Sequence, residues 1–343
     1  MGRIRGAVVT IVSRESIAFL FPGQGSQAVG MGADLAREAP VCRRAFEEAD
    51  EALGFPISRL CFEGPEADLT LTANTQPAIL TVSVAIDRLL AERGARPGFA
   101  AGHSLGEYSA LVSAGVLSFR DAVRAVRLRG TAMQEAVAPG NGAMAAILAL
   151  EPDVVAEICR VEAGSDVVSP ANFNSPEQTV VAGSAPAVSR VCEAALARGA
   201  RRAVPLAVSA PFHCALMRPA ETRLAEHLAS IRFADPAFPV VCNVTAAPIE
   251  SGAQAREALI RQVCSPVRWT ESVRRLVSLG AALFVEVGPG RVLSGLMKRI
   301  EKGCETMNAE NIATVGSVLG RLAPAADEAV AHEVVPATPE ERS

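Results

Sequence analysis

Short continuous runs of apolar residues alternate along this chain with longer stretches in which apolar positions recur every three or four residues. Runs such as Ile17–Phe21 and Leu283–Val287 are typical of strands that are buried on both faces of a parallel sheet. The longer stretches predict amphipathic helices, including residues 34–53, 76–93 and 119–137. This alternation predicts an α/β fold with a parallel sheet at its core.

Prolines and capping residues set the predicted helix boundaries. Pro77 comes directly after Thr75 and Gln76, which places it in the first turn of the helix at 76–93, where proline is tolerated. Ser118 and Asp121 have the spacing of a capping box at the start of the helix at 119–137.

The pattern changes between residues 142 and 209, where four short strands and two helices follow in the order β-α-β-β-α-β. That order is typical of a ferredoxin-like unit, which we interpret as a small subdomain inserted into the larger one. After residue 318 the chain is rich in Ala, Pro and Glu without aromatic residues, so we expect disorder there. The predicted layout is an N-terminal extension at 1–15, a large domain at 16–140 and 210–318, the small subdomain at 141–209 and a disordered tail at 319–343.

Composition narrows the class of protein. The 343 residues are long enough for one large or two smaller domains, and half of them are hydrophobic. A net charge of −4 argues against a general nucleic-acid binder, although it leaves room for a local basic patch. The eight cysteines form no C-x-x-C pair, so we expect no metal site and reduced thiols in the cytoplasm. No apolar stretch is long enough to span a membrane, and the N-terminus lacks the full layout of a signal peptide.

The sharpest chemical signal is Gly102-x-Ser104-x-Gly106, which lies between a short apolar run and a helical pattern. This is the pattern of a strand-to-helix elbow that exposes a nucleophilic serine, and the N–H groups at the start of the helix suit a developing negative charge. The alternative is a turn bounded by glycines that carries an ordinary serine. A second strand–loop–helix unit follows Ile17–Phe21, and its glycine-rich loop lacks the full dinucleotide fingerprint.

A serine nucleophile needs a base, and His213 is the candidate that elimination leaves. His103 is adjacent to the serine, His227 falls within an amphipathic helix, and His332 is in the expected tail. His213 lies at a loop–helix junction, although a purely structural histidine there remains the alternative. Because no acid stands out between Ser104 and His213, we predict a Ser–His dyad whose imidazole is oriented by another group. The pair requires the serine oxygen within about 6 Å of the ring.

Arg129 stands apart from the other arginines of the helix at 119–137. On a helical wheel it lies on the opposite margin from Arg124 and Arg127, among small residues such as Ala122 and Ala125. From spacing alone, a solvated arginine at the edge of the helix is the favoured explanation.

Five motifs together resemble the malonyl-CoA:acyl carrier protein transacylases of fatty-acid and polyketide synthesis. The resemblance covers about residues 16–315 and implies an α/β-hydrolase-like large domain with a ferredoxin-like insert. The motifs are Phe21-Pro22-Gly23-Gln24-Gly25-Ser26-Gln27, Gly102-His103-Ser104-Leu105-Gly106-Glu107-Tyr108, Arg127-Leu128-Arg129-Gly130, Pro211-Phe212-His213-Cys214-Ala215-Leu216-Met217 and Glu286-Val287-Gly288-Pro289-Gly290.

The resemblance assigns roles to the reacting groups. It implies that Ser104 carries the malonyl group as an ester and that His213 takes the serine proton. The backbone amides of Gln24 and Leu105 would form the oxyanion hole. The backbone carbonyl of Gln262 would hold the imidazole, which would account for the missing acid.

It also assigns the residues that select the acyl group. Arg129 would pair with the free malonyl carboxylate, and this overturns the interpretation from spacing. Phe212 would crowd out the α-methyl branch of methylmalonyl, a discrimination worth about 1–3 kcal/mol.

The expected substrates and partners are malonyl-CoA and an acyl carrier protein, either free-standing or within a synthase. We expect no metal or redox cofactor, no nucleic acid, no membrane and a monomer. Lys298, Arg299 and Lys302 are a candidate docking patch for an acidic carrier, although a solvated helix end explains them equally well. Two alternatives stay open: an acyl-thioester hydrolase on the same scaffold and an inactive docking protein.

Overall fold

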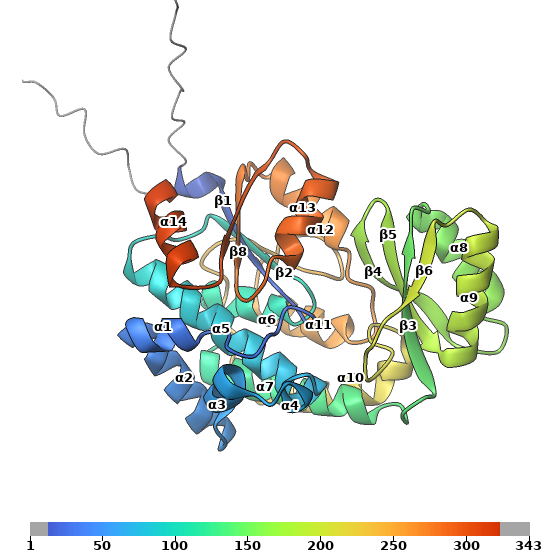
Figure 1. Ribbon diagram of the computed structural model, residues 1–343, viewed down its shortest axis with the longest axis horizontal. Coiled ribbons are helices and arrows are strands. Elements are labelled where there is room, and N and C mark those ends of the chain that lie inside the picture. Colours follow the sequence, from blue (N-terminus) through green and yellow to red (C-terminus); the bar gives the residue numbers. More distant parts are fainter. Residues whose placement is uncertain (1–12, 323–343) are drawn as a thin grey trace, which may run out of the picture.

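A five-stranded parallel sheet forms the centre of the larger part of the molecule (Figure 1). The structure, a computed structural model, describes residues 13–322. The sheet has the order β7-β2-β1-β8-β9, with β1 in the middle. Its strands are β1 Ile17–Phe21, β2 Phe99–Gly102, β7 Val240–Val241, β8 Leu283–Val287 and β9 Glu305–Ala309.

Helices cover both faces of this sheet, as the continuous apolar strands predict. All five residues of β1 are buried. Phe19 and Phe21 face the core that is shared with α2, α5 and α6, whereas Ala18 and Leu20 pack on the other face against apolar side chains of α12 and α13. The helices of the large part are α1 Ala33–Glu38, α2 Pro40–Leu53, α3 Ile57–Glu63, α4 Glu66–Leu69, α5 Thr72–Glu92, α6 Gly106–Ser113, α7 Phe119–Glu135, α10 Arg218–Ala229, α11 Gly252–Gln262, α12 Trp269–Ser278, α13 Val292–Ile300 and α14 Ile312–Leu322, with the short 3₁₀ turns η1 Arg14–Ser16 and η2 Ala215–Met217.

A separate four-stranded antiparallel sheet forms the smaller part, with its own core (Figure 1). Its order, β4-β5-β3-β6, and its two helices on one face are those of a ferredoxin-like unit. The α/β fold with a parallel core and a ferredoxin-like insert is therefore confirmed. The elements are β3 Gly142–Leu148, α8 Pro152–Glu162, β4 Val168–Ser175, β5 Gln178–Ser184, α9 Ala185–Ala197 and β6 Arg202–Pro205.

Two helix predictions were wrong in their details. The expected helix at 34–53 is broken into α1 and α2 at Ala39, because Pro40 disfavours the helical conformation of the residue before it. The helix expected to begin at residue 76 begins at Thr72, so Pro77 lies in its second turn instead of its first.

The C-terminal boundary also differs from the prediction. The strand β9 was not predicted, because it is an edge strand of largely polar residues held by main-chain pairing with β8. The expected end of the large domain at residue 318 falls inside α14, which continues to Leu322. Residues 1–12 and 323–343, which include most of the predicted extension and tail, lie outside the described residues.

The cysteines are free, and Cys42, Cys61, Cys159, Cys214 and Cys242 are buried. Within residues 13–322 no helix combines the length and apolar character needed to cross a membrane.

The early start of α5 brings it into close contact with α7. An added Cβ at Gly130 of α7 would lie 2.6 Å from the Thr72 carbonyl oxygen and 2.9 Å from the Ala73 Cα. Glycine is therefore required for this approach, which places Gln76 of α5 beside Arg129 of α7.

We expect Gly130→Ala to destabilise the fold by about 1–3 kcal/mol through overpacking, although alanine is the better helix former. Gly316→Ala is the matched control, because Gly316 is a helical glycine with open space at its Cβ position. The control should be neutral or slightly stabilising. Chemical denaturation of both variants measures the difference, and a Gly130→Ala protein as stable as the control would contradict the close contact.

Candidate active site

Ser104 lies on a sharp turn between β2 and α6, and its backbone has a φ of 52°, in the left-handed region. Non-glycine residues rarely adopt this conformation unless the surrounding structure enforces it. The turn is tight because an added Cβ at Gly102 would lie 1.9 Å from the Gly106 carbonyl oxygen. The serine hydroxyl therefore projects from the end of the parallel sheet.

Two amide side chains hold the backbone of this serine. Asn243 Oδ1 accepts a hydrogen bond of 2.7 Å from the Ser104 N–H, and its Nδ2 donates to the Gly102 carbonyl at 2.7 Å. Gln262 Nε2 donates to the Ser104 carbonyl at 3.0 Å. Both residues are fully buried, so these bonds are not in competition with water.

The structure brings His213 to this serine across 109 residues of chain. Ser104 Oγ and His213 Nε2 are 2.7 Å apart, and His213 Nδ1 lies 2.9 Å from the backbone carbonyl of Gln262. A carbonyl can only accept, so Nδ1 carries the proton and Nε2 is free to accept from the serine. His213 also has a left-handed φ, of 61°.

Burial lowers the pKa of His213 to about 3, and the positive charge of Arg129 adds to the effect. The imidazole is therefore neutral at pH 7, as a general base requires.

Arg129 is buried and its guanidinium lies at the serine, so the interpretation from spacing alone, a solvated arginine at the helix edge, was wrong. Its Nη2 donates to Ser104 Oγ at 3.0 Å and to Gln262 Oε1 at 2.9 Å, and its Nη1 donates to Gln76 Oε1 at 2.9 Å. The guanidinium carbon is 5.8 Å from the centre of the Tyr108 ring, within the range of a cation–π contact. The small residues that flank it on α7 leave room for this burial.

A cavity of about 200 Å³ opens onto the serine between the two sheets. Ser104, Arg129 and His213 line it from the large part, and Met144 and Val180 of the small sheet form part of its wall. Phe212 lines the cavity and is nearly buried, next to the histidine. A small acyl group attached to Ser104 would therefore be enclosed by both parts of the molecule.

Gln24 and Leu105 line the same cavity. Within residues 13–322, neither backbone N–H has a protein acceptor. The side chain of Gln24 is held by a hydrogen bond of 3.1 Å from its Nε2 to Thr72 Oγ1. The two amides are thus available to an oxyanion that forms at Ser104.

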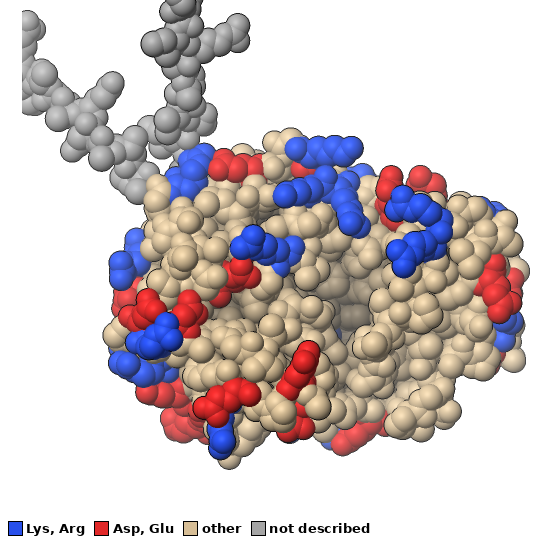
Figure 2. Space-filling model, in the orientation of Figure 1, with Lys and Arg blue, Asp and Glu red and all other residues tan. Residues whose placement is uncertain are grey.

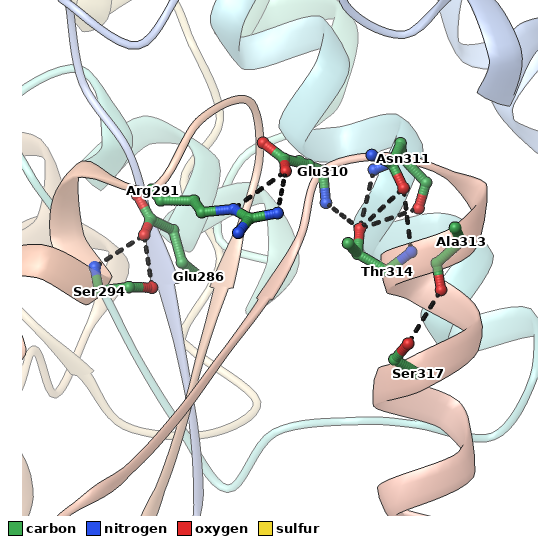
Figure 3. A network of polar contacts seen from close by, with 8 residues as sticks. All are labelled: Glu286, Arg291, Ser294, Glu310, Asn311, Ala313, Thr314 and Ser317. Carbon is green, nitrogen blue, oxygen red and sulfur yellow. Dashed lines mark hydrogen bonds and ion pairs between the residues drawn. The ribbon is translucent and has the colours of Figure 1, made fainter.

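The helix α13 forms another wall and is fastened to the sheet by Glu286 (Figure 3). The carboxylate of Glu286 accepts from the N–H groups of Leu293 at 2.9 Å and Ser294 at 2.7 Å, in the first turn of α13. Arg291, just before the helix, pairs with Glu310 at 2.9 Å, after β9 (Figure 3). These contacts fix the position of Leu293, which lines the cavity.

Sequence reasoning missed several residues of the site. Gln76 and Asn243 are neutral amides outside the recognised motifs, so nothing in their local pattern distinguished them. Asn174 Oδ1 of the small sheet accepts a hydrogen bond of 2.8 Å from His103 Nε2, which links the two parts beside the serine. Glu107 was inside a quoted motif, and an acid in an otherwise apolar helix turn was the available signal.

Comparisons with known proteins agree with one another. Residues 18–335 match the family model described as acyl transferase domain. The chain is 52% identical to the malonyl CoA-acyl carrier protein transacylase of Escherichia coli K12 over 284 residues, which cover 82% of this chain and 92% of that protein. It is 46% identical to the protein of the same name from Bacillus subtilis 168, over 91% and 99% of the two chains.

Solved structures give the same result. An acyl carrier protein S-malonyltransferase from Vibrio cholerae superposes with a TM-score of 0.87 at 49% identity, covering 88% of this chain and 99% of that one. A malonyl-transacylase solved in complex with a type II PKS acyl-carrier protein also has a TM-score of 0.87 and 49% identity, over 89% and 99% of the chains.

Because the pKa of His213 is low, we predict that the reactivity of Ser104 changes little as the pH falls from 7 to 5. The base is active when neutral, and lowering its pKa moves the loss of the neutral form toward lower pH. The rate at which a fluorophosphonate probe labels the serine at pH 5 should stay within about threefold of its value at pH 7, whereas an imidazole with the ordinary pKa would lose about 25-fold. Ser104→Ala identifies the labelled site, and a rate that halves near pH 6.5 would contradict the prediction.

Proposed function

This chain belongs to the acyl transferase domain family, and we propose that it transfers a malonyl group from malonyl-CoA to the phosphopantetheine thiol of an acyl carrier protein. The resemblance stated from the sequence is confirmed by relatives that are about half identical over most of both chains. Their names support the substrates proposed, and the complex of one relative with a carrier protein supports the acceptor.

One observation carries the proposal: a buried guanidinium lies 3.0 Å from the hydroxyl of a serine that is paired with a neutral histidine. A malonyl ester on Ser104 ends in a carboxylate two carbon atoms beyond the ester carbonyl. Arg129 is close enough to pair with that carboxylate, and its planar fork suits a bidentate contact. An unbranched monoacid would leave the buried cation without this partner.

In the first half-reaction, Ser104 Oγ attacks the thioester carbonyl while His213 Nε2 takes its proton. The negative charge that develops on the carbonyl oxygen is stabilised by the amides of Gln24 and Leu105, each of which contributes about 10²–10³ in rate. The C–S bond then breaks, and His213 returns the proton to the departing thiolate of coenzyme A. The product is the malonyl ester of Ser104.

The second half-reaction runs the same chemistry with the carrier. His213 takes the proton of the phosphopantetheine thiol, and the sulfur attacks the ester carbonyl. The C–O bond breaks, and His213 returns the proton to Ser104 Oγ. Gln262 holds the imidazole in one tautomer through both steps, so no third acid is needed.

The chemistry as proposed uses no metal or redox cofactor, and cytoplasmic location and a monomeric state stay predictions.

Figure 2 shows Lys and Arg side chains mainly above the hollow in this face and acidic ones below it. The exposed cations Lys298 and Arg299 lie in the last turn of α13, a wall of the cavity, and Lys302 follows. This arrangement supports α13 as the side that an acidic carrier approaches.

A hydrolase on the same scaffold is the second candidate. Arg129 disfavours it for unbranched acyl groups, which have no carboxylate to hold, and the intact contact between Ser104 and His213 disfavours an inactive docking protein.

With malonyl-CoA alone, we expect Ser104 to be labelled and the ester to persist until a carrier is added. Radiolabelled malonyl-CoA and intact-protein mass spectrometry measure formation and decay. Ser104→Ala should take up no label because the nucleophile is gone. Release of malonate into water as fast as transfer to the carrier would favour the hydrolase, and wild-type protein that takes up no label would favour the docking protein.

Arg129→Ala should lower kcat/KM for malonyl transfer by at least 100-fold, because a charge-assisted contact is lost. Acetyl transfer should fall by less than 10-fold. Arg124→Ala is a matched control on the same helix, since Arg124 contacts the Ala52 carbonyl away from the cavity. An equal loss for both acyl groups would rule out recognition of the carboxylate.

A further inference from the structure

Glu107 is a buried carboxylate that the mechanism above does not use. It follows Gly106 at the start of α6 and has no solvent-exposed surface. Its Oε2 accepts two hydrogen bonds, one of 3.0 Å from the backbone N–H of Asn243 and one of 2.8 Å from Gln262 Nε2. Within residues 13–322, its Oε1 has no partner.

Both donors belong to residues that hold the reacting groups. Asn243 fixes the Ser104 backbone through its Oδ1. Gln262 accepts a hydrogen bond from His213 Nδ1 with its backbone carbonyl and one from Arg129 Nη2 with its Oε1. One carboxylate oxygen therefore contacts both supports of the site, although it touches none of the reacting atoms.

The orientation of the Gln262 amide depends on these neighbours. Its Nε2 has two hydrogens, and these point to Ser104 O and to Glu107 Oε2. If the amide were turned over, its oxygen would face these two acceptors and its NH₂ group would face the donating Arg129. In the observed orientation, Oε1 accepts from Arg129 Nη2.

We propose that Glu107 is a positioning residue for acyl-group selection: by accepting from Gln262 Nε2 and Asn243 N–H, it fixes the Gln262 amide so that Arg129 is aimed at the carboxylate of the bound acyl group. This inference rests on the proposed function, since it concerns how malonyl is preferred over acetyl.

The contribution of Glu107 is the placement of an acceptor and does not require its negative charge. Burial raises the pKa of Glu107 to about 7, against the hydrogen bonds and the cation that favour its ionised form. A proton carried on Oε1, the oxygen without a partner, leaves both bonds to Oε2 in place. Glutamine at this position keeps one acceptor oxygen of the same reach, whereas methionine keeps the shape and removes the acceptor.

The test compares the malonyl-to-acetyl ratio of kcat/KM in Glu107→Met, Glu107→Gln and the wild type, using the full chain and a purified carrier protein. Asp87→Leu is the control, because Asp87 is a half-buried carboxylate with a raised pKa that accepts a hydrogen bond of 2.9 Å from Ser113 Oγ, at the far end of α6 from Glu107. Thermal unfolding of each variant reports the loss of stability. Should Glu107→Met not fold, Glu107→Asp retracts the same acceptor by one methylene.

We expect Glu107→Met to lower the ratio at least 10-fold, Glu107→Gln to recover it to within about threefold of the wild type, and Asp87→Leu to lower stability without moving the ratio. Gln262→Met removes the amide that Glu107 is proposed to fix. Adding Glu107→Met to that variant should therefore cause no further change in the malonyl-to-acetyl ratio. A ratio that stays unchanged while both rates fall would overturn the inference and assign Glu107 a general structural role. Wild-type protein that transfers no malonyl would instead overturn the proposed function.

Discussion

The arrangement of the site depends on how a guanidinium is kept charged inside the protein without a carboxylate in contact with it. Burying an unpaired charge is costly, and a directly bound carboxylate would occupy the place that the substrate needs. Among residues 13–322, the hydrogen-bond partners of Arg129 are the neutral oxygens of Gln76, Gln262 and Ser104, and the Tyr108 ring lies beneath it. The cation is thereby solvated by fixed dipoles that leave part of its fork open.

The stabilisation of Arg129 by neutral side chains constrains how α5 packs against α7. Gln76 reaches Arg129 because α5 approaches α7 closely at Gly130, and this contact requires α5 to begin several residues before the point that Pro77 suggests. Both reacting residues, Ser104 and His213, also have backbone conformations that are costly for side-chain-bearing residues. The strain at Ser104 is held by Asn243 and Gln262, so the support for the cation and the support for the nucleophile share a residue.

The features that could be predicted from the sequence were those with a local signature in residue type and spacing. Ser104 followed from its glycine spacing and His213 from elimination, and the parallel sheet followed from runs such as Ile17–Phe21. Arg129 could not be placed from periodicity, because a wheel shows which face a residue occupies and says nothing about what packs on it. The roles proposed for Gln24, Leu105, Gln262 and Phe212 came from family resemblance alone.

The elements that were missed have a common physical cause: each depends on partners distant in the chain. The strand β9 exists through pairing with β8, and its own residues are largely polar. Gln76 and Asn243 act through hydrogen bonds to Arg129 and Ser104, which are 53 and 139 positions away, and such contacts have no local period.

Gln262 binds His213 through its main chain and Arg129 through its side chain. The proton acceptor and the anion receptor therefore share one anchor at the end of α11, and a displacement of that helix end would carry both in the same direction. Reactivity and acyl preference are mechanically linked as a result. A substitution at position 262 changes the side chain that contacts Arg129 and keeps the backbone carbonyl that orients His213. Evolution can therefore alter acyl selectivity at this position and retain the general base.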